Sequence, residues 1–246
     1  MLQAVCIQGK KLDMDRARRL ADQFQVDLVK VPPQGKDAMY FLFDRSGLSL
    51  VQGKKVLKGD LTNMLSRVTG GHLAHEILLK AAKPGEGRLR GVDATAGMGE
   101  DALILAAAGY EMELFEHNPI TAALLQDSLW RARKQPDLKD IVARMKLTQG
   151  DSKDLLSALT YEPDLIYLDP MFPEKKKGGE TKKKLQMLHQ IEAPCADEED
   201  LVQTAIQTGA RKIVIKRPPE GPFLAGLTPS YQVTRKAVRF DCLVFS

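Results

Sequence analysis

The feature that most constrains the fold of this chain is a regular alternation of strand-like and helix-like segments that begins at residue 88. Strands are expected at residues 88–95, 111–116, 146–149, 164–168 and 212–216, and helices at residues 100–108, 119–134, 154–159 and 197–208. Such alternation is typical of a parallel sheet with helices on both faces. Two final strands, at residues 231–235 and 239–245, have no helix between them. The sequence therefore predicts an α/β fold whose mostly parallel sheet closes with an antiparallel edge.

The residues before this alternation follow a different pattern. Short strands are expected at residues 4–8, 26–31, 39–44 and 48–52, and a helix at residues 13–24 with Asp13 as its N-cap. A further helix, at residues 69–83, leads into the first strand of the larger sheet. We therefore expect a small α+β N-terminal domain over residues 1–62 and a second domain over residues 63–246.

Composition excludes several classes of protein. No apolar run in the 246 residues approaches the roughly 20 that a membrane helix needs, and the first residues do not resemble a secretory signal. Cys6, Cys195 and Cys242 are isolated, which favours free thiols in a reducing cytoplasm over disulfides or zinc. The net charge of +4 permits a polyanionic partner without requiring one.

A glycine-containing turn follows the first strand of the larger sheet. Gly97 and Gly99 let the backbone turn sharply, and a ligand can approach the main-chain N–H groups with no Cβ in the way. Such a ligand is expected in the crevice beyond the carboxyl ends of the strands. A dinucleotide fingerprint would have a third glycine where Ala102 stands. A turn of this kind occurs in many α/β proteins and does not identify the ligand by itself.

Carboxylates around this turn narrow the choice of ligand. Glu100 and Asp101 come directly after Gly99, where they disfavour a pyrophosphate and favour a ligand with a positive amino group. The methionine end of S-adenosylmethionine has both a carboxylate, for the backbone donors, and an ammonium, for Asp93 or Asp101. We therefore expect S-adenosylmethionine as the cofactor.

Two further strand ends carry polar residues suited to a nucleoside. Glu116 closes the second strand and can accept hydrogen bonds from both ribose hydroxyls. His117 either lies against the adenine or caps the following helix. Asp151 and Ser152, after the third strand, are placed to accept from the adenine amino group and line the pocket, or to cap the helix expected at residues 154–159.

The segment LDPMFP, which ends the fourth strand, carries the candidate chemistry. Asp169 is expected to face the methyl group of the cofactor, and Phe172 offers a ring on which a base can stack, worth ~1–3 kcal/mol. Pro170 and Pro173 stiffen the turn. Asp169 can accept an N–H of an exocyclic amine and hold the nitrogen in line with the methyl carbon. Such positioning supplies most of the rate in a transfer of this kind. The alternative is a strand-ending turn with a buried phenylalanine.

Basic segments lie near the same edge of the predicted sheet. Six lysines fall within residues 174–184, and the loop at residues 216–222 either touches RNA phosphates or is an inert connection. His72, His75 and Glu76 have metal-compatible spacing but lack a third ligand of known location. We therefore expect an RNA partner and no metal.

On these motifs the chain resembles the Rossmann-like class I S-adenosylmethionine-dependent methyltransferases over residues 88–246. VDATAGMGEDA, FEHNP, GDS, LDPMFP and VIKRP are similar to the ribosomal small subunit methyltransferase J family. That resemblance implies methyl transfer to the exocyclic N2 of a guanosine near the 3′ end of 16S rRNA, position 1516 in the family, with 16S rRNA or the small subunit as partner. The residues it implies at the cofactor site are Glu100, Asp101, Glu116, His117, Asp151, Ser152 and Asp169.

Three residues depart from the pattern of such enzymes. Met171 stands where amino-methyltransferases have a second proline, Phe172 where they often have tyrosine, and Glu100 where many relatives have a basic residue. Two other functions use a similar sheet: a nicotinamide-dependent oxidoreductase and a non-catalytic RNA-binding module. The missing third glycine disfavours the first, and the presence of Gly97, Gly99, Glu116 and Asp169 disfavours the second. The sequence leaves the oligomeric state open.

Overall fold

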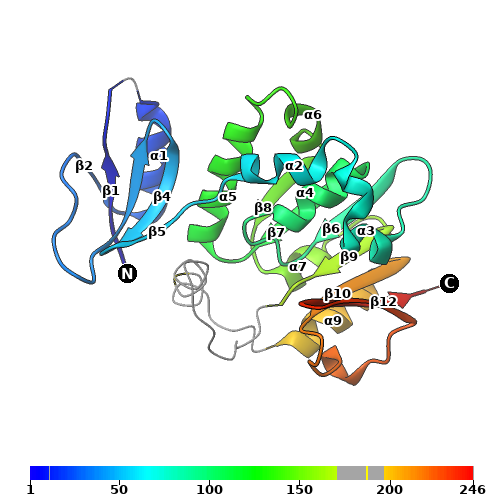
Figure 1. Cartoon of the computed structure of the whole chain (residues 1–246). Coiled ribbons are helices and arrows are strands. Elements are labelled where there is room, and N and C mark those ends of the chain that lie inside the picture. The colour runs from blue at the N-terminus through cyan, green and yellow to red at the C-terminus, as the bar shows by residue number, and fades with distance from the viewer. Residues whose placement is uncertain (11, 171–186, 188–196, 246) are drawn as a thin grey trace.

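The structure, a computed structural model, describes residues 1–10, 12–170, 187 and 197–245. It contains two sheets that lie side by side in Figure 1, a five-stranded one near the N-terminus and a seven-stranded one that includes the C-terminal strands. The mixed α/β architecture expected from the sequence is confirmed.

The seven-stranded sheet has the order β11-β12-β10-β9-β6-β7-β8. Its strands are β6 (Leu89–Asp93), β7 (Tyr110–Glu116), β8 (Met145–Gln149), β9 (Leu165–Leu168), β10 (Lys212–Arg217), β11 (Tyr231–Arg235) and β12 (Val238–Val244). β6 to β10 run parallel, whereas β12 is antiparallel to both β10 and β11. The antiparallel closing edge is therefore confirmed. Because the chain leaves β6 to one side for β7 and later returns to its other side as β9, a crevice is expected beyond the carboxyl ends of these strands.

Helices cover both faces of this sheet. They are α2 (Leu65–Val68), α3 (Ile77–Ala82), α4 (Glu100–Ala107), α5 (Pro119–Ala132), α6 (Lys139–Val142), α7 (Ser152–Ser157) and α9 (Glu198–Gln207). β9 shows why both faces are buried. Leu165 and Tyr167 join the core that includes α4, while Ile166 and Leu168 join the core that includes α7 and α9. Because both alternating sets of residues in β9 are buried, one on each face of the sheet, the strand is a continuous apolar run in the sequence.

The expected helix at residues 69–83 is wrong in its extent. Here the chain forms α2, then a 3₁₀ turn at His72–His75, then α3. Gly70 and Gly71 have φ values of 63° and 84°, and Glu76 is extended, so a continuous helix cannot pass through them. Among the described residues, no helix is long and apolar enough to span a bilayer.

The smaller sheet has the order β2-β1-β3-β4-β5. Its strands are β1 (Leu2–Ile7), β2 (Asp27–Val29), β3 (Met39–Asp44), β4 (Gly47–Gln52) and β5 (Lys55–Leu57), and α1 (Met14–Phe24) packs against it. Asp13 caps α1 as predicted, because its side chain accepts from the Arg16 amide at 3.1 Å. The division into residues 1–62 and 63–246 stays a prediction, since a 3₁₀ turn at Leu61–Met64 spans that point.

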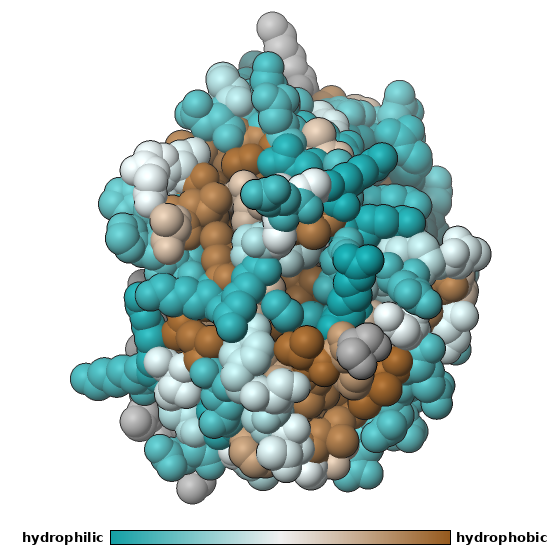
Figure 2. All heavy atoms as spheres, turned by 90° about the vertical axis from the view of Figure 1, so that its right-hand side faces the viewer, coloured by the Kyte–Doolittle hydropathy of each residue, from teal (hydrophilic) through white to brown (hydrophobic). Residues whose placement is uncertain are grey.

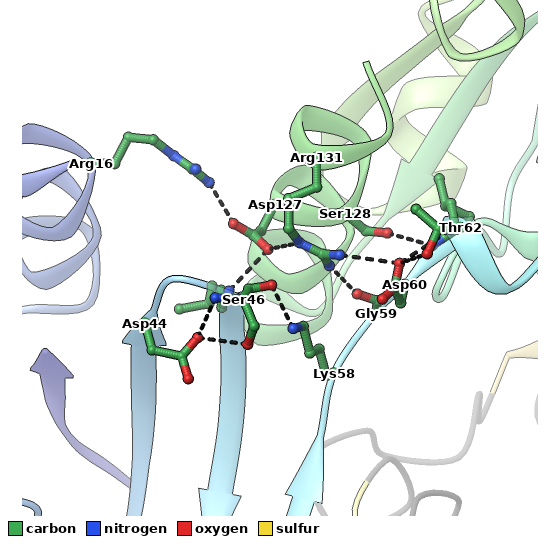
Figure 3. Close-up of polar contacts among 12 residues, drawn as sticks. Arg16, Asp44, Ser46, Lys58, Gly59, Asp60, Thr62, Asp127, Ser128 and Arg131 are labelled. Atoms are coloured by element: carbon green, nitrogen blue, oxygen red, sulfur yellow. Dashed lines mark hydrogen bonds and ion pairs between the residues drawn. The ribbon is translucent and has the colours of Figure 1, made fainter. Parts of the chain in front are cut away.

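The two sheets are joined through Asp127 of α5, which is 1% exposed. Its carboxylate accepts from Arg16 of α1 at 2.7 Å, from the Leu48 amide of β4 at 2.9 Å and from Arg131 at 2.8 Å. Figure 3 shows Arg16 reaching from α1 across to this carboxylate. Trp130 of α5 is half-buried, and the guanidinium of Arg16 lies over its ring, 4.1 Å from the ring centroid.

A hollow of about 280 Å³ lies beside this junction. It is lined by Arg16, Arg19, Leu20, Gln23, Phe43, Leu48, Ala122, Ala123, Gln126, Asp127, Leu147 and Gln149. None of these residues is among the candidate site residues, so the hollow is separate from the chemistry expected near Asp169.

The edge strand β11 of the larger sheet carries exposed polar side chains. Gln232, Thr234 and Arg235 of the edge strand β11 are exposed. Figure 2 shows the side of the molecule that faces right in Figure 1, where polar groups separate the apolar patches. Polar residues along an edge strand discourage pairing with another chain.

Candidate active site

Three of the predicted site carboxylates lie at the carboxyl ends of neighbouring strands in the larger sheet. Asp93 ends β6, Glu116 ends β7, and Asp169 follows directly after β9. These strands are parallel neighbours, with Asp93 opposite Leu114 of β7 and Tyr167 of β9. Side chains that leave the carboxyl ends of adjacent parallel strands lie in the same crevice.

The two glycines of the turn after β6 have different surroundings. Gly97 has φ 52°, and the nearest atom to an added Cβ is the Thr95 carbonyl oxygen, 3.8 Å away. Gly99 has φ 76°, and its added Cβ would lie only 2.7 Å from the Leu125 side chain. Gly97 therefore leaves open space beside the backbone, whereas Gly99 allows α4 to begin close to α5.

The amide groups of both glycines have partners inside the protein. Gly97 donates to Oε2 of Glu116 at 2.9 Å, and Gly99 donates to the Ala96 carbonyl at 2.8 Å. These two amides are therefore used within the protein, and the contact of the cofactor carboxylate with backbone donors near this turn stays a prediction. The first N–H groups of α4, which begins at Glu100, have no acceptor within the helix, so they are backbone donors that a ligand can use.

Glu116 is held in place at the end of β7. It is 4% exposed, and its Oε1 accepts from the Asn118 amide at 2.8 Å while its Oε2 accepts from Gly97. Each carboxylate oxygen has two lone pairs and can accept more than one hydrogen bond, as a contact with ribose hydroxyls would require. The helix cap here is Asn118, whose side chain accepts from the Ile120 and Thr121 amides. His117 is therefore not the cap; its side chain is 60% exposed, with Nδ1 3.5 Å from Glu116.

Asp151 and Ser152 begin α7, as one of the two interpretations predicts. Asp151 is the N-cap and accepts from the Lys153 amide at 2.8 Å. Ser152 donates from Oγ to the carbonyl of Ala94 at 2.6 Å, which fixes the start of α7 to the exit of β6. Their contact with adenine stays a prediction.

Asp93 lies deepest in the site and is 1% exposed. Burial raises the pKa of Asp93 to about 8, although the hydrogen bond of 3.0 Å from the Thr95 amide opposes this. The neighbouring charges of Asp101, Asp169 and Glu116 raise the pKa further. Asp93 is thus a carboxyl group that a nearby positive charge would ionise.

Lys216, expected where the fifth strand passes into a loop and not predicted as a site residue, lies within the site. The ammonium of Lys216, at the end of β10, is 2.8 Å from Oδ2 of Asp101 and 2.8 Å from Oδ2 of Asp169. The hydroxyl of Tyr167 donates to the same oxygen of Asp101 at 2.6 Å. A tyrosine in a strand buried on both faces needs a hydrogen-bond partner, and this was the available signal in the sequence.

The charges of the site favour a positively charged ligand. We call Asp93, Asp101, Glu116 and Asp169 the acidic cluster; Lys216 forms ion pairs with two of its members, Asp101 and Asp169. Such a surplus of carboxylates repels a pyrophosphate and attracts a sulfonium or an ammonium. The residues present therefore fit S-adenosylmethionine better than a dinucleotide.

Two expectations fall on residues that the structure does not describe. Phe172, the expected stacking ring, and the lysines of residues 174–184 lie outside the described residues. Of the three residues with metal-compatible spacing, Glu76 accepts from Arg67 at 2.7 Å through each of its carboxylate oxygens.

Comparison with known proteins agrees with this geometry. The family described as "Putative SAM-dependent methyltransferase" matches residues 22–245. A relative from Neisseria gonorrhoeae named ribosomal RNA small subunit methyltransferase J is 35% identical over 234 residues, which cover 92% of each chain. The chain belongs to the ribosomal RNA small subunit methyltransferase J family. A Pseudomonas aeruginosa member is 41% identical over 155 residues, 63% of this chain and 59% of that protein.

A solved structure supports the same assignment. The crystal structure of an S-adenosylmethionine-dependent methyltransferase from Neisseria gonorrhoeae superposes with a TM-score of 0.77 and 31% identity, covering 98% of this chain and 96% of that one. Membership in the methyltransferase J family means that the cofactor is S-adenosylmethionine. Neither the nicotinamide-dependent oxidoreductase nor the non-catalytic RNA-binding module is compatible with this membership.

Proposed function

We propose that this enzyme transfers the methyl group of S-adenosylmethionine to the exocyclic N2 of a guanosine in 16S rRNA, at the family position 1516. The observation that carries the proposal is the position of Asp169. It leaves β9 beside Asp93 and the turn at Gly97, where the crevice of such a sheet holds its ligand. The names of the relatives support the small-subunit RNA as substrate.

Residues around the crevice are proposed to bind different parts of the cofactor. Glu116 accepts from the ribose hydroxyls, and Asp151 and Ser152 line the adenine end with the exposed ring of His117 beside it. Asp93 faces the ammonium, because Asp101 is already bound by Lys216 and Tyr167. The open space at Gly97 lets the ligand lie close to the backbone, and Glu100 contributes through the amino end of α4.

Asp169 acts on the amine that receives the methyl group. The exocyclic amine of guanine is a weak nucleophile, because its lone pair is delocalised into the ring. A carboxylate that accepts one N–H holds this nitrogen in line with the methyl carbon. The nitrogen–carbon bond would then form as the carbon–sulfur bond breaks, with the electron pair of that bond left on sulfur, and the nitrogen would afterwards lose its proton to the carboxylate of Asp169 and from there to water. Positioning of this kind supplies ~7–11 kcal/mol in favourable cases.

Further parts of the proposal concern recognition of the RNA. We propose that Phe172 stacks on the target base and that the lysines of residues 174–184 contact phosphates. The enzyme would act in the cytoplasm, where the small subunit is assembled.

The test is methyl transfer to RNA from cells that lack this protein. Purified enzyme and S-adenosylmethionine with a labelled methyl group are incubated with total RNA and, separately, with small subunits, and the RNA is digested to nucleosides. The proposal predicts label in N2-methylguanosine from 16S rRNA, with one site per molecule. The variant Asp169→Asn is the matched control, because it keeps the shape of the side chain and removes the charge. Label in another nucleoside, or none in either substrate, would contradict the proposed function.

A further inference from the structure

Lys216 joins two parts of the site that are far apart in the sequence. Ile215 of β10 pairs with Leu168 of β9, so Lys216 and Asp169 leave their strands side by side at the same edge of the sheet. The ammonium of Lys216 is 2.8 Å from Asp169 and 2.8 Å from Asp101, at the first turn of α4. The Lys216 side chain is 33% exposed, so its ion pairs are partly buried away from water.

Asp101 fixes the ammonium from the other side. Its Oδ2 accepts both from Lys216 and from the hydroxyl of Tyr167 at 2.6 Å. Tyr167 is fully buried in β9 and cannot change position without disturbing the core. Tyr167, Asp101, Lys216 and Asp169 therefore form a connected row of hydrogen bonds that begins in the core and ends at the proposed reacting group.

Asp169 is thereby held at two points. Its amide donates to Oγ1 of Thr95 at 2.6 Å, and its Oδ2 accepts from Lys216. In the part of the chain that the structure describes, Oδ1 accepts no hydrogen bond. Oδ1 is therefore the oxygen available to an incoming N–H group.

Lys216 also acts on the protonation of Asp169. Burial raises the pKa of Asp169 and the charge of Lys216 lowers it, with the net result above the ordinary value. Burial lowers the pKa of Lys216, but attraction by Asp101 and Asp169 outweighs this and the net pKa is raised. The titratable groups around Asp169 are Asp93 of β6, Asp101 of α4, Tyr167 of β9 and Lys216 of β10.

We propose, on the basis of the methyl transfer proposed above, that Lys216 is a positioning residue: it binds Oδ2 of Asp169, keeps this side chain a carboxylate and directs Oδ1 toward the amine of the substrate. A protonated Asp169 would offer an O–H donor where the amine needs an acceptor. Loss of Lys216 should therefore slow the transfer most strongly at low pH, where Asp169 is protonated first.

The experiment compares Lys216→Met and Lys216→Arg with Lys212→Met. Lys212 is a matched control in the same strand, because its ammonium donates to the Ala82 carbonyl at the opposite end of β10. The first readout is kcat against pH. For Lys216→Met we expect a kcat at least tenfold lower at pH 7 and an acidic limb shifted upward by about one pH unit, with the KM for S-adenosylmethionine within threefold. Lys216→Arg should keep the limb near its original position, and Lys212→Met should match the unmodified enzyme.

The second readout does not depend on RNA. The ¹³C signal of the Asp169 carboxyl, assigned by comparison with Asp169→Asn, is followed against pH in the unmodified protein and in Lys216→Met. The proposal predicts a higher midpoint in Lys216→Met. An unchanged midpoint, or a shifted midpoint with an unchanged kcat profile, would overturn it. If the unmodified enzyme transfers no methyl group to RNA, the proposed function fails, and the titration still decides whether Lys216 controls Asp169.

Discussion

The amide of Gly97 donates a hydrogen bond of 2.9 Å to Oε2 of Glu116, and this bond fixes the turn after β6 to the end of β7. A second amide, that of Asn118, binds the other carboxylate oxygen at 2.8 Å. Glu116 therefore shapes the turn in addition to its proposed contact with the ribose, and both roles can be tested by changing this one side chain.

Replacement of Glu116 should weaken cofactor binding and stability together. In Glu116→Ala the amides of Gly97 and Asn118 lose their acceptor, which costs ~1–3 kcal/mol for each buried donor left unpaired. We expect a lower free energy of unfolding and at least tenfold weaker binding of S-adenosylhomocysteine, measured by urea denaturation and calorimetry. Glu116→Gln, which keeps one acceptor oxygen, should lie between. If Glu116→Ala binds as tightly as the unmodified protein, the assignment of the ribose site is wrong.

Asp169→Ala should separate catalysis from cofactor binding. Asp169 lies at the edge of the crevice with its side chain 36% exposed, and its proposed contact is with the substrate amine. We expect no detectable methyl transfer, while the affinity for S-adenosylhomocysteine stays within about tenfold, a margin of ~1.4 kcal/mol. Unchanged turnover in this variant would remove Asp169 from the mechanism.

Asp93 should make the stability of the protein depend on pH. The pKa of Asp93 is about 8 in the folded state against an ordinary value of 3.8, so between these values the folded chain holds a proton that the unfolded chain has lost. Its contribution to stability is therefore present at low pH and is lost as the pH rises toward 8. In thermal denaturation between pH 5 and 8, the Tm of Asp93→Asn should fall less than that of the unmodified protein. Parallel curves would show that Asp93 titrates in its ordinary range.

Gly99→Ala should be more harmful than Gly109→Ala. Both glycines have positive φ, 76° and 103°, so both variants suffer backbone strain of ~1–2 kcal/mol. Only at Gly99 does the new methyl group also meet Leu125, 2.7 Å away, whereas no atom lies within 4 Å at Gly109. Overpacking adds ~1–3 kcal/mol, to be measured as the difference between the two free energies of unfolding. Equal losses in the free energy of unfolding would mean that α5 moves to make room for the methyl group at no measurable cost.

Asp127→Ala should loosen the connection between the two sheets. It removes the shared acceptor of Arg16, the Leu48 amide and Arg131, and removal of one partner from a buried ion pair costs ~3–5 kcal/mol. Urea denaturation should show this loss, and hydrogen exchange should increase in β4. Asp15→Ala is the control, because its pair with Arg18 is exposed and such pairs contribute ~0–1 kcal/mol. A loss no greater than in the control would contradict the role of Asp127.

The sequence predicted those parts of the fold that depend on local pattern. The parallel strands β6 to β10 alternate with helical segments and turn residues, so each could be placed within one or two residues. Asp13 was predicted as a cap, and capping was one of the two interpretations of Asp151; the structure shows both residues as caps. The helix expected at residues 69–83 was too long, because no local pattern indicates that Glu76 is extended and that α3 begins only after it.

The site was predictable only up to the strand ends. That Asp93, Glu116 and Asp169 lie at one edge follows from parallel pairing. The bond between Lys216 and Asp101 joins residues 115 positions apart and depends on which strands are neighbours, which no local pattern specifies. Likewise, the bond from the Gly97 amide to Glu116 joins the ends of two different strands, and only the three-dimensional structure shows it.

The most direct test of the account is a crystal structure of the enzyme with sinefungin, an analogue that carries an amine where the methyl group would be. We predict that its ribose lies against Glu116, that its amino-acid end lies between Gly97 and Asp93, and that the added amine points toward Asp169. An analogue bound elsewhere, or one whose amine points away from Asp169 toward open solvent, would contradict the account.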